Sequence, residues 1–262
     1  MARPDRFSTG TLLNFDLAGR TALITGGGGA FGVAIARRFT AAGARVALAD
    51  IRGDRAREIA TTLSQDGFEA VALAGDVSDA VHAARLVDAT LHAFGQLDIL
   101  VNNAGFMGRT APLWELEDGD WDDVIRVDLT SVFNMSRAAI RHMLSRRSGT
   151  IVNVSSIAGK EGTPQLIPYS VAKAGIIAFT KALGKEVIRE GIRVNCVAPG
   201  VIQTPLLDQL PKESVELMLS KSPMGRFGTP DEVAAVIHFL ASDAASFITA
   251  QCFDASGGRA TY

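Results

Sequence analysis

Short runs of apolar and β-branched residues recur along the chain and predict β-strands. The runs lie at Thr21–Thr25, Arg45–Asp50, Ala70–Ala74, Leu97–Val101, Thr150–Val154 and Arg193–Val197. They lack the alternation of apolar and polar residues that a strand with one solvated face would show. Continuous apolar strands are typical of a parallel sheet that helices cover on both faces.

Longer segments between these runs carry apolar residues at spacings of three and four, the period of a helix with one buried face. They span Ala30–Ala42, Arg55–Gln65, Ser78–Phe94, Trp121–Arg146 and Pro168–Glu190. Strands and helices that alternate in this way predict a doubly wound α/β fold, in which ligands bind beyond the carboxyl ends of the strands. We therefore look for functional residues directly after each strand.

The chain has no internal repeat and no low-complexity linker, which predicts a single domain. We expect a loose N-terminal extension over residues 1–19 and one domain over residues 20–262, with residues 201–224 as a substrate loop. The segments Ala234–Leu240 and Phe247–Phe253 are more apolar than an exposed tail. They predict a last helix and strand that contact another subunit.

Composition argues against several classes of protein. The 262 residues carry 26 basic and 28 acidic side chains, a formal net charge of −2, and no basic run that would favour a nucleic-acid partner. No segment resembles a signal peptide or approaches the roughly 20 apolar residues of a membrane span. Since Cys196 and Cys252 are interpreted as buried small apolar residues, we expect a cytoplasmic protein. The four histidines lack metal-ligand spacing, so no metal site is expected.

A glycine-rich turn follows the first predicted strand and runs directly into a helical segment. Glycines allow the backbone to turn tightly and to approach a pyrophosphate, whose charge is stabilised by the free N–H groups at a helix start. The turn therefore predicts a dinucleotide site. Its residues are Gly26, Gly28, Gly29, Phe31 and Gly32.

Asp50 ends the second predicted strand, 24 residues beyond Gly26. A carboxylate at this place accepts hydrogen bonds from both ribose hydroxyls and repels a 2′-phosphate, which favours NAD over NADP. Ile51 after it adds no positive charge, although Arg52 stands close to it. An alternative interpretation is that Asp50 only caps the helix that follows.

Tyr169 and Lys173 stand four residues apart on a predicted helix and therefore share one of its faces. The fifth strand ends at a serine pair, and Ser156 stands 13 residues before Tyr169. Oxidation of an alcohol requires a base, and a free phenol, with a reference pKa of about 10, is mostly protonated at neutral pH. A nearby ammonium favours the phenolate, so the pair predicts proton transfer. The alternative is a solvated tyrosine and lysine on a surface helix.

These motifs resemble, in order and position, those of the short-chain dehydrogenase/reductase family. The turn TGGGGAFG is similar to the family's Thr-Gly-x-x-x-Gly-x-Gly, with Ala30 in place of its second glycine. Further matches follow the third, fourth and sixth strands: Asp76-Val77, Asn102-Asn103-Ala104-Gly105, and Pro199-Gly200 with Ile202 and Thr204. The resemblance covers nearly the whole chain and implies a Rossmann fold of about seven strands flanked by helices.

The resemblance also implies what these residues do. Asp76 and Val77 would contact the adenine, and the loop from Pro199 to Thr204 would hold the nicotinamide. Further cofactor contacts are implied for Asn103, Ala104, Gly105, Ile202, Tyr169 and Lys173. By the same resemblance, Tyr169 is the general acid and base, Lys173 binds the nicotinamide ribose and favours the phenolate, and Ser156 hydrogen-bonds the substrate oxygen.

One position departs from the family pattern. The family usually has Val-Asn-Leu where this chain has Val127-Asp128-Leu129, and that asparagine organises a water connected to the catalytic lysine. An aspartate can also orient water, and it can pair with Lys173 and raise the pKa of that lysine. Whether Asp128 is a catalytic residue stays open at this point.

Three loops after the fourth, fifth and sixth strands are expected to form the substrate pocket. They span Phe106–Pro112, Gly159–Ile167 and Val201–Met224. Polar candidates for substrate contact are Arg109, Glu161 and Gln165, beside Ser156 and Tyr169. The alternative for the three loop residues is that they are simply solvated.

The segment Gly159-Lys160-Glu161-Gly162 is similar to family members that act on sugar acids, which implies NAD-linked oxidation of a polar, sugar-derived substrate. The segment Pro223–Val233 resembles 3-oxoacyl thioester reductases as well, but their usual NADP preference fits Asp50 poorly. A third hypothesis is a sensor that binds a dinucleotide without catalysis. Family members are usually tetramers, so we expect a homotetramer, and we hypothesise that Arg259 reaches a neighbouring subunit's pocket.

Overall fold

The computed structural model describes residues 14–203 and 212–261. Within these residues seven strands form one sheet in the order β3-β2-β1-β4-β5-β6-β7, and neighbouring strands are parallel throughout. The strands are β1 (Thr21–Thr25), β2 (Arg45–Asp50), β3 (Ala70–Ala74), β4 (Ile99–Asn102), β5 (Gly149–Val154), β6 (Ile192–Pro199) and β7 (Cys252–Ala255). The chain order reverses between β1 and β4, and ligands of such sheets bind beyond the carboxyl ends of the strands there.

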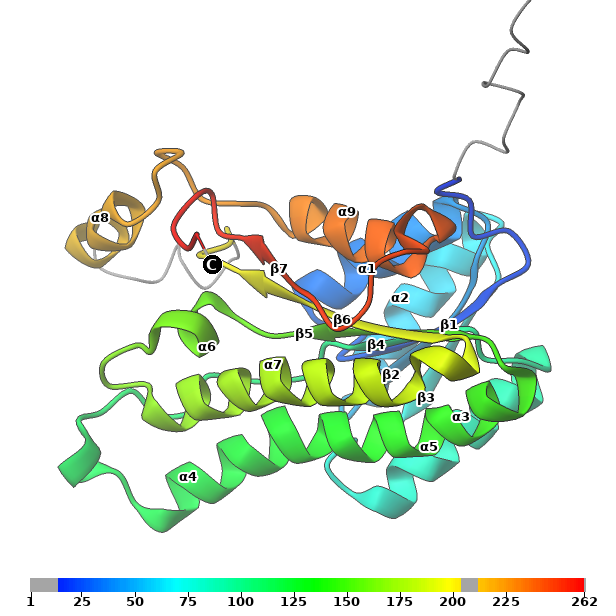
Figure 1. Ribbon diagram of the computed structural model, residues 1–262, viewed down its shortest axis with the longest axis horizontal. Coiled ribbons are helices and arrows are strands. Elements are labelled where there is room, and N and C mark those ends of the chain that lie inside the picture. The colour runs from blue at the N-terminus through cyan, green and yellow to red at the C-terminus, as the bar shows by residue number, and fades with distance from the viewer. Residues whose placement is uncertain (1–13, 204–211, 262) are drawn as a thin grey trace, which may run out of the picture.

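Helices cover both faces of the sheet (Figure 1). One face carries α1 (Ala30–Ala41), α2 (Gly53–Gln65) and α9 (Pro230–Ala241), and the other carries α3 (Ala80–Phe94), α5 (Ser131–Arg146) and α7 (Ile167–Val187). The shorter helices α4 (Asp118–Val124), α6 (Ile157–Glu161) and α8 (Lys212–Ser220) lie toward the end of the molecule at which the strands terminate. The predicted doubly wound fold is confirmed.

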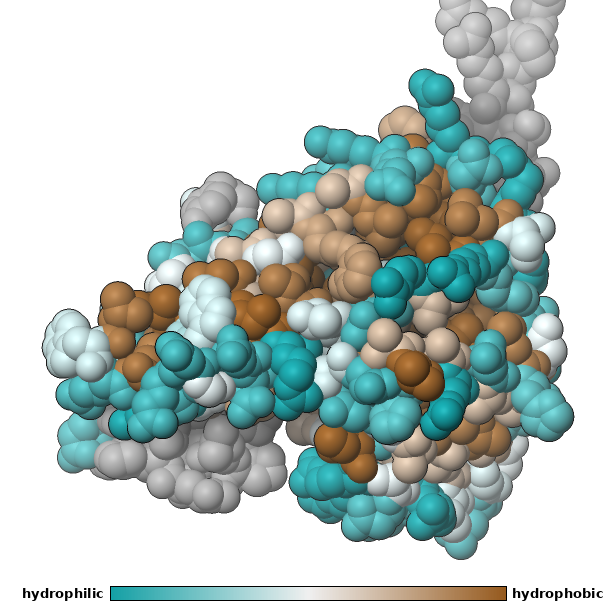
Figure 2. Space-filling model, turned by 90° about the horizontal axis from the view of Figure 1, so that it is seen from below, coloured by the Kyte–Doolittle hydropathy of each residue, from teal (hydrophilic) through white to brown (hydrophobic). Residues whose placement is uncertain are grey.

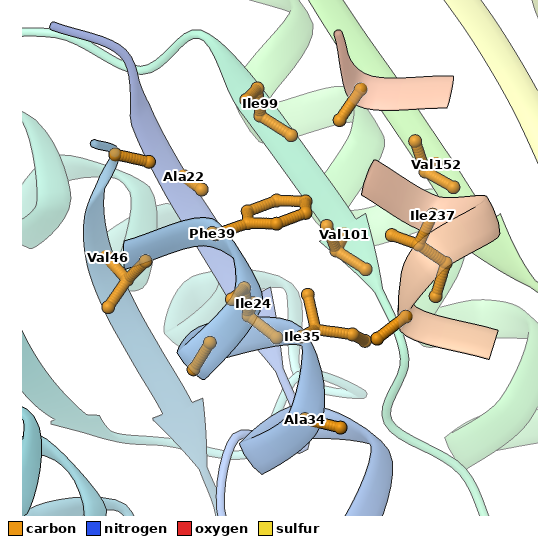
Figure 3. Close-up of a cluster of buried hydrophobic side chains, with 14 of the residues drawn as sticks. Ala22, Ile24, Ala34, Ile35, Phe39, Val46, Ile99, Val101, Val152 and Ile237 are labelled. Carbon is orange, nitrogen blue, oxygen red and sulfur yellow. The ribbon is translucent and has the colours of Figure 1, made fainter. Parts of the chain in front are cut away.

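Successive residues of one strand serve two separate cores. Ala22 and Ile24 belong to the cluster that contains Phe39 of α1 and Ile237 of α9, as Figure 3 shows. Leu23 between them packs into the cluster on the opposite face. Phe39 is fully buried, and burial of such a side chain stabilises the fold by roughly 1.5–3 kcal/mol. Burial on both faces explains why the strands are apolar without alternation.

Some element boundaries differ from the prediction for local reasons. The Asp79 carboxylate caps α3, which therefore begins at Ala80 rather than at Ser78. The segment predicted as one helix contains a π-helical turn, Ile125–Thr130, between α4 and α5. The last predicted strand begins at Cys252, later than expected, and joins β6 within the sheet.

The N-terminal segment is held to the domain before residue 19. Leu17 is fully buried, and its N–H donates to the Ala42 carbonyl at 2.8 Å. The Phe15 carbonyl oxygen lies 2.5 Å from Nε2 of His238 on α9. Burial of Leu17 means that the expected loose extension does not reach residue 19, and residues 1–13 of it lie outside the described residues.

Two kinds of feature are absent from the residues that the structure describes. No helix in residues 14–203 and 212–261 is both long and apolar enough to cross a bilayer. The same residues contain no group of three histidine, cysteine, aspartate or glutamate side chains arranged to hold a metal ion.

Candidate functional site

Thr25 fastens the glycine turn after β1 to the end of β4. Its hydroxyl donates to the Val101 carbonyl at 3.3 Å and accepts from the N–H groups of Asn103 and Ala104 at 2.9 and 3.0 Å. The Asn103 side chain in turn donates to the carbonyls of Thr25 and Gly26. The ends of β1 and β4, the two strands at which the chain order reverses, therefore hold the glycine turn in place.

Glycine is required at two positions of this turn. Gly26 has a φ of +64°, in the left-handed region, and a Cβ on Gly32 would collide with the Gly26 carbonyl oxygen. No described side chain caps the start of α1, so its first N–H groups can receive an anionic ligand. This cradle is one that a pyrophosphate fits.

The Asp50 carboxylate lies against the same turn. One oxygen accepts from the Gly28 N–H and the other from the Arg52 N–H, both at 2.9 Å. The side chain is only 7% exposed. Arg52, not Asp50, is the N-cap residue of α2, which argues against the capping interpretation. Asp50 thus holds a negative charge at the edge of the turn, where a ribose would lie.

A cleft of about 480 Å³ opens beside this turn. Ten of the predicted cofactor residues line it: Gly26, Gly29, Phe31, Asp50, Ile51, Asp76, Val77, Asn103, Ala104 and Gly105. Arg52 and Arg126 contribute positive charge to its walls. A glycine cradle beside a carboxylate, in one continuous cleft, fits a dinucleotide.

Asp76 forms an ion pair with Arg126. The sequence analysis did not predict Arg126 as a residue of the site. The Arg126 guanidinium lies 3.4 Å from the Asp76 carboxylate and donates to the Ser78 hydroxyl at 2.5 Å. Burial opposes ionisation of Asp76, but hydrogen bonds from Ser78 and the Arg126 charge outweigh it and hold the pKa of Asp76 below its ordinary value. Asp76 is therefore an anion fixed by its neighbours.

Ser156 and the Tyr169–Lys173 pair belong to two helices that pack together, α6 and α7. The Ser156 hydroxyl accepts from the Ala158 N–H at 3.1 Å and so caps α6. Lys173 Nζ lies 5.4 Å from the centroid of the Tyr169 ring. Gly159 permits the close approach, because a Cβ there would lie 2.5 Å from the Lys173 carbonyl carbon. The geometry leaves Tyr169 partly exposed with a cation above its ring.

Lys173 is buried, and its ammonium has two protein partners. Its ammonium donates to the Val154 carbonyl at 3.2 Å and lies 3.0 Å from Oδ2 of Asp128. Burial lowers the pKa of Lys173, but the charges of Asp128 and Tyr169 outweigh this and raise it above its ordinary value. The Ser155 hydroxyl donates to the Lys173 carbonyl at 2.8 Å, a backbone contact that also orients the helix.

Asp128 lies in the π-helical turn and is fully buried. Its second oxygen, Oδ1, accepts from the Phe106 N–H at 2.8 Å. A Cβ on Gly105 would stand 2.8 Å from Oδ2. The ion pair with Lys173, one of the two possibilities that the sequence leaves open, is present in the structure. The contact with Phe106 connects this pair to the loop after β4.

The three loop residues predicted to contact substrate already have protein partners. Arg109 donates to the Glu115 carbonyl at 3.0 Å and lies 3.3 Å from the Asp120 carboxylate. Glu161 accepts two hydrogen bonds from Arg259, at 2.9 and 2.6 Å. The third residue, Gln165, is exposed, with a positive φ, and its carbonyl accepts from the Ala111 N–H at 3.1 Å. These contacts are all within the protein. Those of Glu161 and Gln165 join the loop after β5 to the C-terminal segment and to the loop after β4.

The loop after β6 lies beside a second cavity, of about 330 Å³. Ile202 is one of its lining residues, and Gly200 packs so closely on Ser256 that a Cβ would lie 2.8 Å from the Ser256 Cα. Pro199 ends β6 next to this contact. Thr204, the other residue predicted in this loop, lies outside the described residues.

Comparison with known proteins decides the family. A family model described as enoyl-(acyl carrier protein) reductase matches residues 28–260. The chain belongs to the short-chain dehydrogenase/reductase family. It is therefore an oxidoreductase that acts on CH–OH groups and binds a nicotinamide dinucleotide.

Individual relatives in this family cover nearly the whole chain. The chain is 44% identical over 245 residues to 2-dehydro-3-deoxy-L-rhamnonate dehydrogenase (NAD(+)) of Sphingomonas sp. (strain SKA58), which covers 94% of this chain and 97% of the relative. It is 41% identical over 249 residues to 3-oxoacyl-acyl-carrier-protein reductase FabG of Thermotoga maritima, over 92% of this chain and 98% of the relative. The structure of an NAD+-bound xylitol dehydrogenase matches with a TM-score of 0.90 and 30% identity, over 92% of this chain and 99% of that one.

Two features of the site were not predicted from the sequence. Arg126 lines the cofactor cleft from the π-helical turn, and Arg259 pairs with Glu161 of the same chain. A short-chain dehydrogenase/reductase motif gives no signal for either, because each contact joins residues that are distant in the sequence. Arg259 thus has a partner, Glu161, within its own chain. The hypothesis that Arg259 reaches a neighbouring subunit's pocket stays a prediction.

Proposed function

We propose that the protein is an NAD-dependent dehydrogenase that interconverts a secondary alcohol and a ketone on a polar, sugar-derived substrate, a sugar acid or polyol. The buried Asp50 carboxylate against the glycine turn is the observation that carries the cofactor preference. It offers acceptors to ribose hydroxyls and repels a 2′-phosphate, since like charges brought together without screening cost several kcal/mol. The arginine at position 52 lies 4.0 Å from this carboxylate and is mostly exposed, so it balances little of that repulsion.

The chain supplies the proton chemistry of this reaction. A bound nicotinamide supplies the hydride acceptor for oxidation and the hydride donor for reduction. In oxidation, Tyr169 would take the hydroxyl proton while a bound nicotinamide would accept the hydride of the same carbon, so that the O–H and C–H bonds break as the C=O bond forms. Lys173 stabilises the phenolate by its charge, and Ser156 holds the substrate oxygen.

Preference for a sugar acid or polyol rests on the polar surroundings of the site and on the relatives. The cavity beside the loop after β6 is lined by Lys221, Arg226 and Arg259, by the carboxylates of Glu232 and Asp254, and by apolar side chains. Arg226 pairs with Glu232 at 2.6 Å, which leaves Lys221 and Arg259 as the cations for a substrate. Positive side chains suit a substrate carboxylate. The 44% identical relative is named for a deoxy-sugar acid, and a matching structure is named for a polyol dehydrogenase.

A second candidate function is reduction of a 3-oxoacyl thioester. The 41% identity to the Thermotoga maritima reductase supports it. The Asp50 carboxylate favours our first choice, because its charge opposes the 2′-phosphate of NADPH. A dinucleotide sensor without catalysis is a third alternative, and the paired Tyr169 and Lys173 argue against it.

Initial rates across a substrate panel test the proposal. Sugar acids, polyols and 3-oxoacyl thioesters are each supplied with the NAD and the NADP form of the cofactor, and absorbance of the reduced nicotinamide is followed. We expect turnover of a sugar acid or polyol with NAD+. Faster turnover of a thioester with NADPH would support the second candidate, and NADH binding without turnover of any substrate would support the sensor.

We also propose a homotetramer in the cytoplasm. Patches of apolar side chains lie between hydrophilic ones on the side of the molecule that carries α4 and α5 (Figure 2). Large apolar side chains that are exposed on these helices include Trp121 and Phe133. Exposed apolar area of this kind is typical of subunit contacts. Light scattering at micromolar concentration tests the assembly, and a monomer mass would contradict it.

A further inference from the structure

Behind the Tyr169–Lys173 pair lies a carboxylate that the proposed reaction does not require. Asp128 is fully buried, and its side chain meets Lys173 at 3.0 Å. The family usually has an asparagine here, which is polar but uncharged. A buried carboxylate is costly unless a cation and hydrogen bonds balance it, so its presence beside the lysine has consequences for charge.

The Asp128 carboxylate has a hydrogen bond on one oxygen and an ion-pair contact on the other. The Phe106 N–H holds Oδ1 at 2.8 Å, and the lysine ammonium faces Oδ2. Gly105 leaves room for the carboxylate, because a Cβ there would approach Oδ2 to 2.8 Å. The π-helical turn Ile125–Thr130 brings the side chain to this place between α4 and α5. The ion pair is therefore a built feature of the site.

We infer that Asp128 is a positioning residue whose charge neutralises the Lys173 ammonium and thereby sets the pH at which Tyr169 accepts the substrate proton. An ammonium without a counter-ion stabilises a nearby phenolate strongly in a buried site. A carboxylate 3.0 Å from the ammonium offsets that field at the phenol. Deprotonation of Tyr169 then requires a higher pH than it would with an uncharged residue at position 128. The inference deepens the proposed function, since it rests on Tyr169 as the base.

Several other charged groups on the elements packed against α7 are engaged elsewhere, and Asp118 and Asp122 of α4 are exposed to solvent. On α4, Asp120 pairs with Arg109 and Asp123 with Arg126. On α6, Lys160 pairs with Asp254 and Glu161 with Arg259. On β6, Arg193 donates to the carbonyls of Leu240 and Ser242, and after α7 Glu190 pairs with Arg147. The charges that act on Lys173 are those of Asp128 and Tyr169.

The chain allows a direct test that needs no substrate, because it contains only two tyrosines, Tyr169 and Tyr262. In a Tyr262→Phe background, the rise of tyrosinate absorbance with pH reports Tyr169 alone. We expect Asp128→Asn to move the midpoint of this titration to lower pH by about one unit, the scale of shift that a nearby charge causes. Glu190→Gln is the matched control: it also removes a carboxylate from an ion pair, but one with Arg147 and not with Lys173, and it should leave the midpoint in place.

Two outcomes would overturn the inference. The midpoint would stay unchanged if the charge of Asp128 did not reach the phenol. It would move to higher pH if the carboxylate served mainly to keep Lys173 protonated, because loss of the cation would then dominate. Thermal unfolding and NADH binding of each variant establish that it is folded.

Turnover separates this inference from the proposed function. If Asp128→Asn shifts the tyrosinate midpoint as expected while no panel substrate is oxidised, the inference stands and the proposed function fails. If turnover depends on Tyr169 but the midpoint and the pH profile of kcat/KM are the same with Asp128 and with asparagine, the inference fails and the function stands. A lower-pH profile in the variant supports both.

Discussion

The cofactor half of the site and the substrate half are held together in different ways. Around the glycine turn, contacts involve backbone groups: Thr25 receives two N–H donors from the loop after β4, and Asp50 receives one from Gly28. On the proposed substrate side, one backbone contact joins Ala111 and Gln165, and charged side chains such as Glu161 and Arg259 supply the other contacts. Backbone contacts tolerate few substitutions, whereas an ion pair at the surface changes without loss of the fold. Under the proposed function, cofactor binding would depend on the fold itself, and substrate choice on exchangeable side chains.

Loss of the base should have the largest effect. Tyr169→Phe removes the hydroxyl that takes the proton, and we expect turnover to fall about 10²–10⁴-fold while NADH affinity stays within a few-fold. Steady-state rates on the substrate identified in the panel measure this. Tyr262→Phe is the control and should be fully active. Retention of more than a tenth of wild-type activity by Tyr169→Phe would argue that another group accepts the proton.

A side chain added to the glycine turn should have the second largest effect. In Gly32→Ala the new Cβ meets the Gly26 carbonyl, so the turn has to shift, at a cost of about 1–3 kcal/mol in the free energy of unfolding. We expect weaker NADH binding together with a lower Tm. Gly119→Ala is a matched control, since it lies in α4 with open space around its Cβ position, and it should be neutral or stabilising. Equal NADH affinity in both variants would mean that the turn is not the phosphate site.

Removal of one charge should change cofactor choice. Asp50→Asn keeps the shape of the side chain but removes its repulsion of a 2′-phosphate, and we expect the preference for NAD over NADP to fall by about tenfold or more. Ratios of kcat/KM for the two cofactors measure it. Asp54→Asn removes an acid from the first turn of α2 and should leave the ratio unchanged. A similar change in both variants would indicate a general charge effect.

On the substrate side a smaller effect is expected. Arg259→Gln breaks the contact with Glu161, and the pair is part-exposed, so the free energy of unfolding should fall by less than about 1 kcal/mol. We expect a KM several-fold higher for an acidic substrate and an unchanged KM for a neutral polyol. Equal KM values in the variant and the wild type for both substrates would remove Arg259 from substrate binding.

The smallest effect concerns alkaline stability. The pKa of Lys173 is raised in the folded state, so its contribution to the free energy of unfolding is complete below the ordinary lysine value and is lost as pH rises through the higher folded value. Denaturant unfolding at a series of alkaline pH values should show this loss, and Asp128→Asn should show less of it. A steeper alkaline loss in the variant would contradict the ion pair as its source.

The sequence predicts the cofactor side of the site better than the substrate side. The turn, Asp50 and the Tyr169–Lys173 pair each depend on residues close in sequence or at fixed helical spacing, so their patterns are visible in the chain itself. The strands were found because burial on both faces leaves them continuously apolar, as Leu23 and Ile24 show by packing into opposite cores.

The parts that were not predictable depend on contacts between distant residues or on details of helix geometry. The π-helical turn Ile125–Thr130 has the same apolar spacing as the helices around it, so the sequence predicts one helix through it. Arg126 reaches the cofactor cleft from that turn, and Arg259 meets Glu161 across 98 positions. Side-chain pairing of this kind leaves no periodic pattern.

Direct binding of the two reduced cofactors tests the central claim, that the backbone turn and Asp50 together form an NAD site. Dissociation constants of the wild-type protein for NADH and NADPH can be measured by nucleotide fluorescence without any substrate. We predict that NADH binds at least about tenfold more tightly, a difference of about 1.4 kcal/mol. Tighter binding of NADPH would contradict the claim.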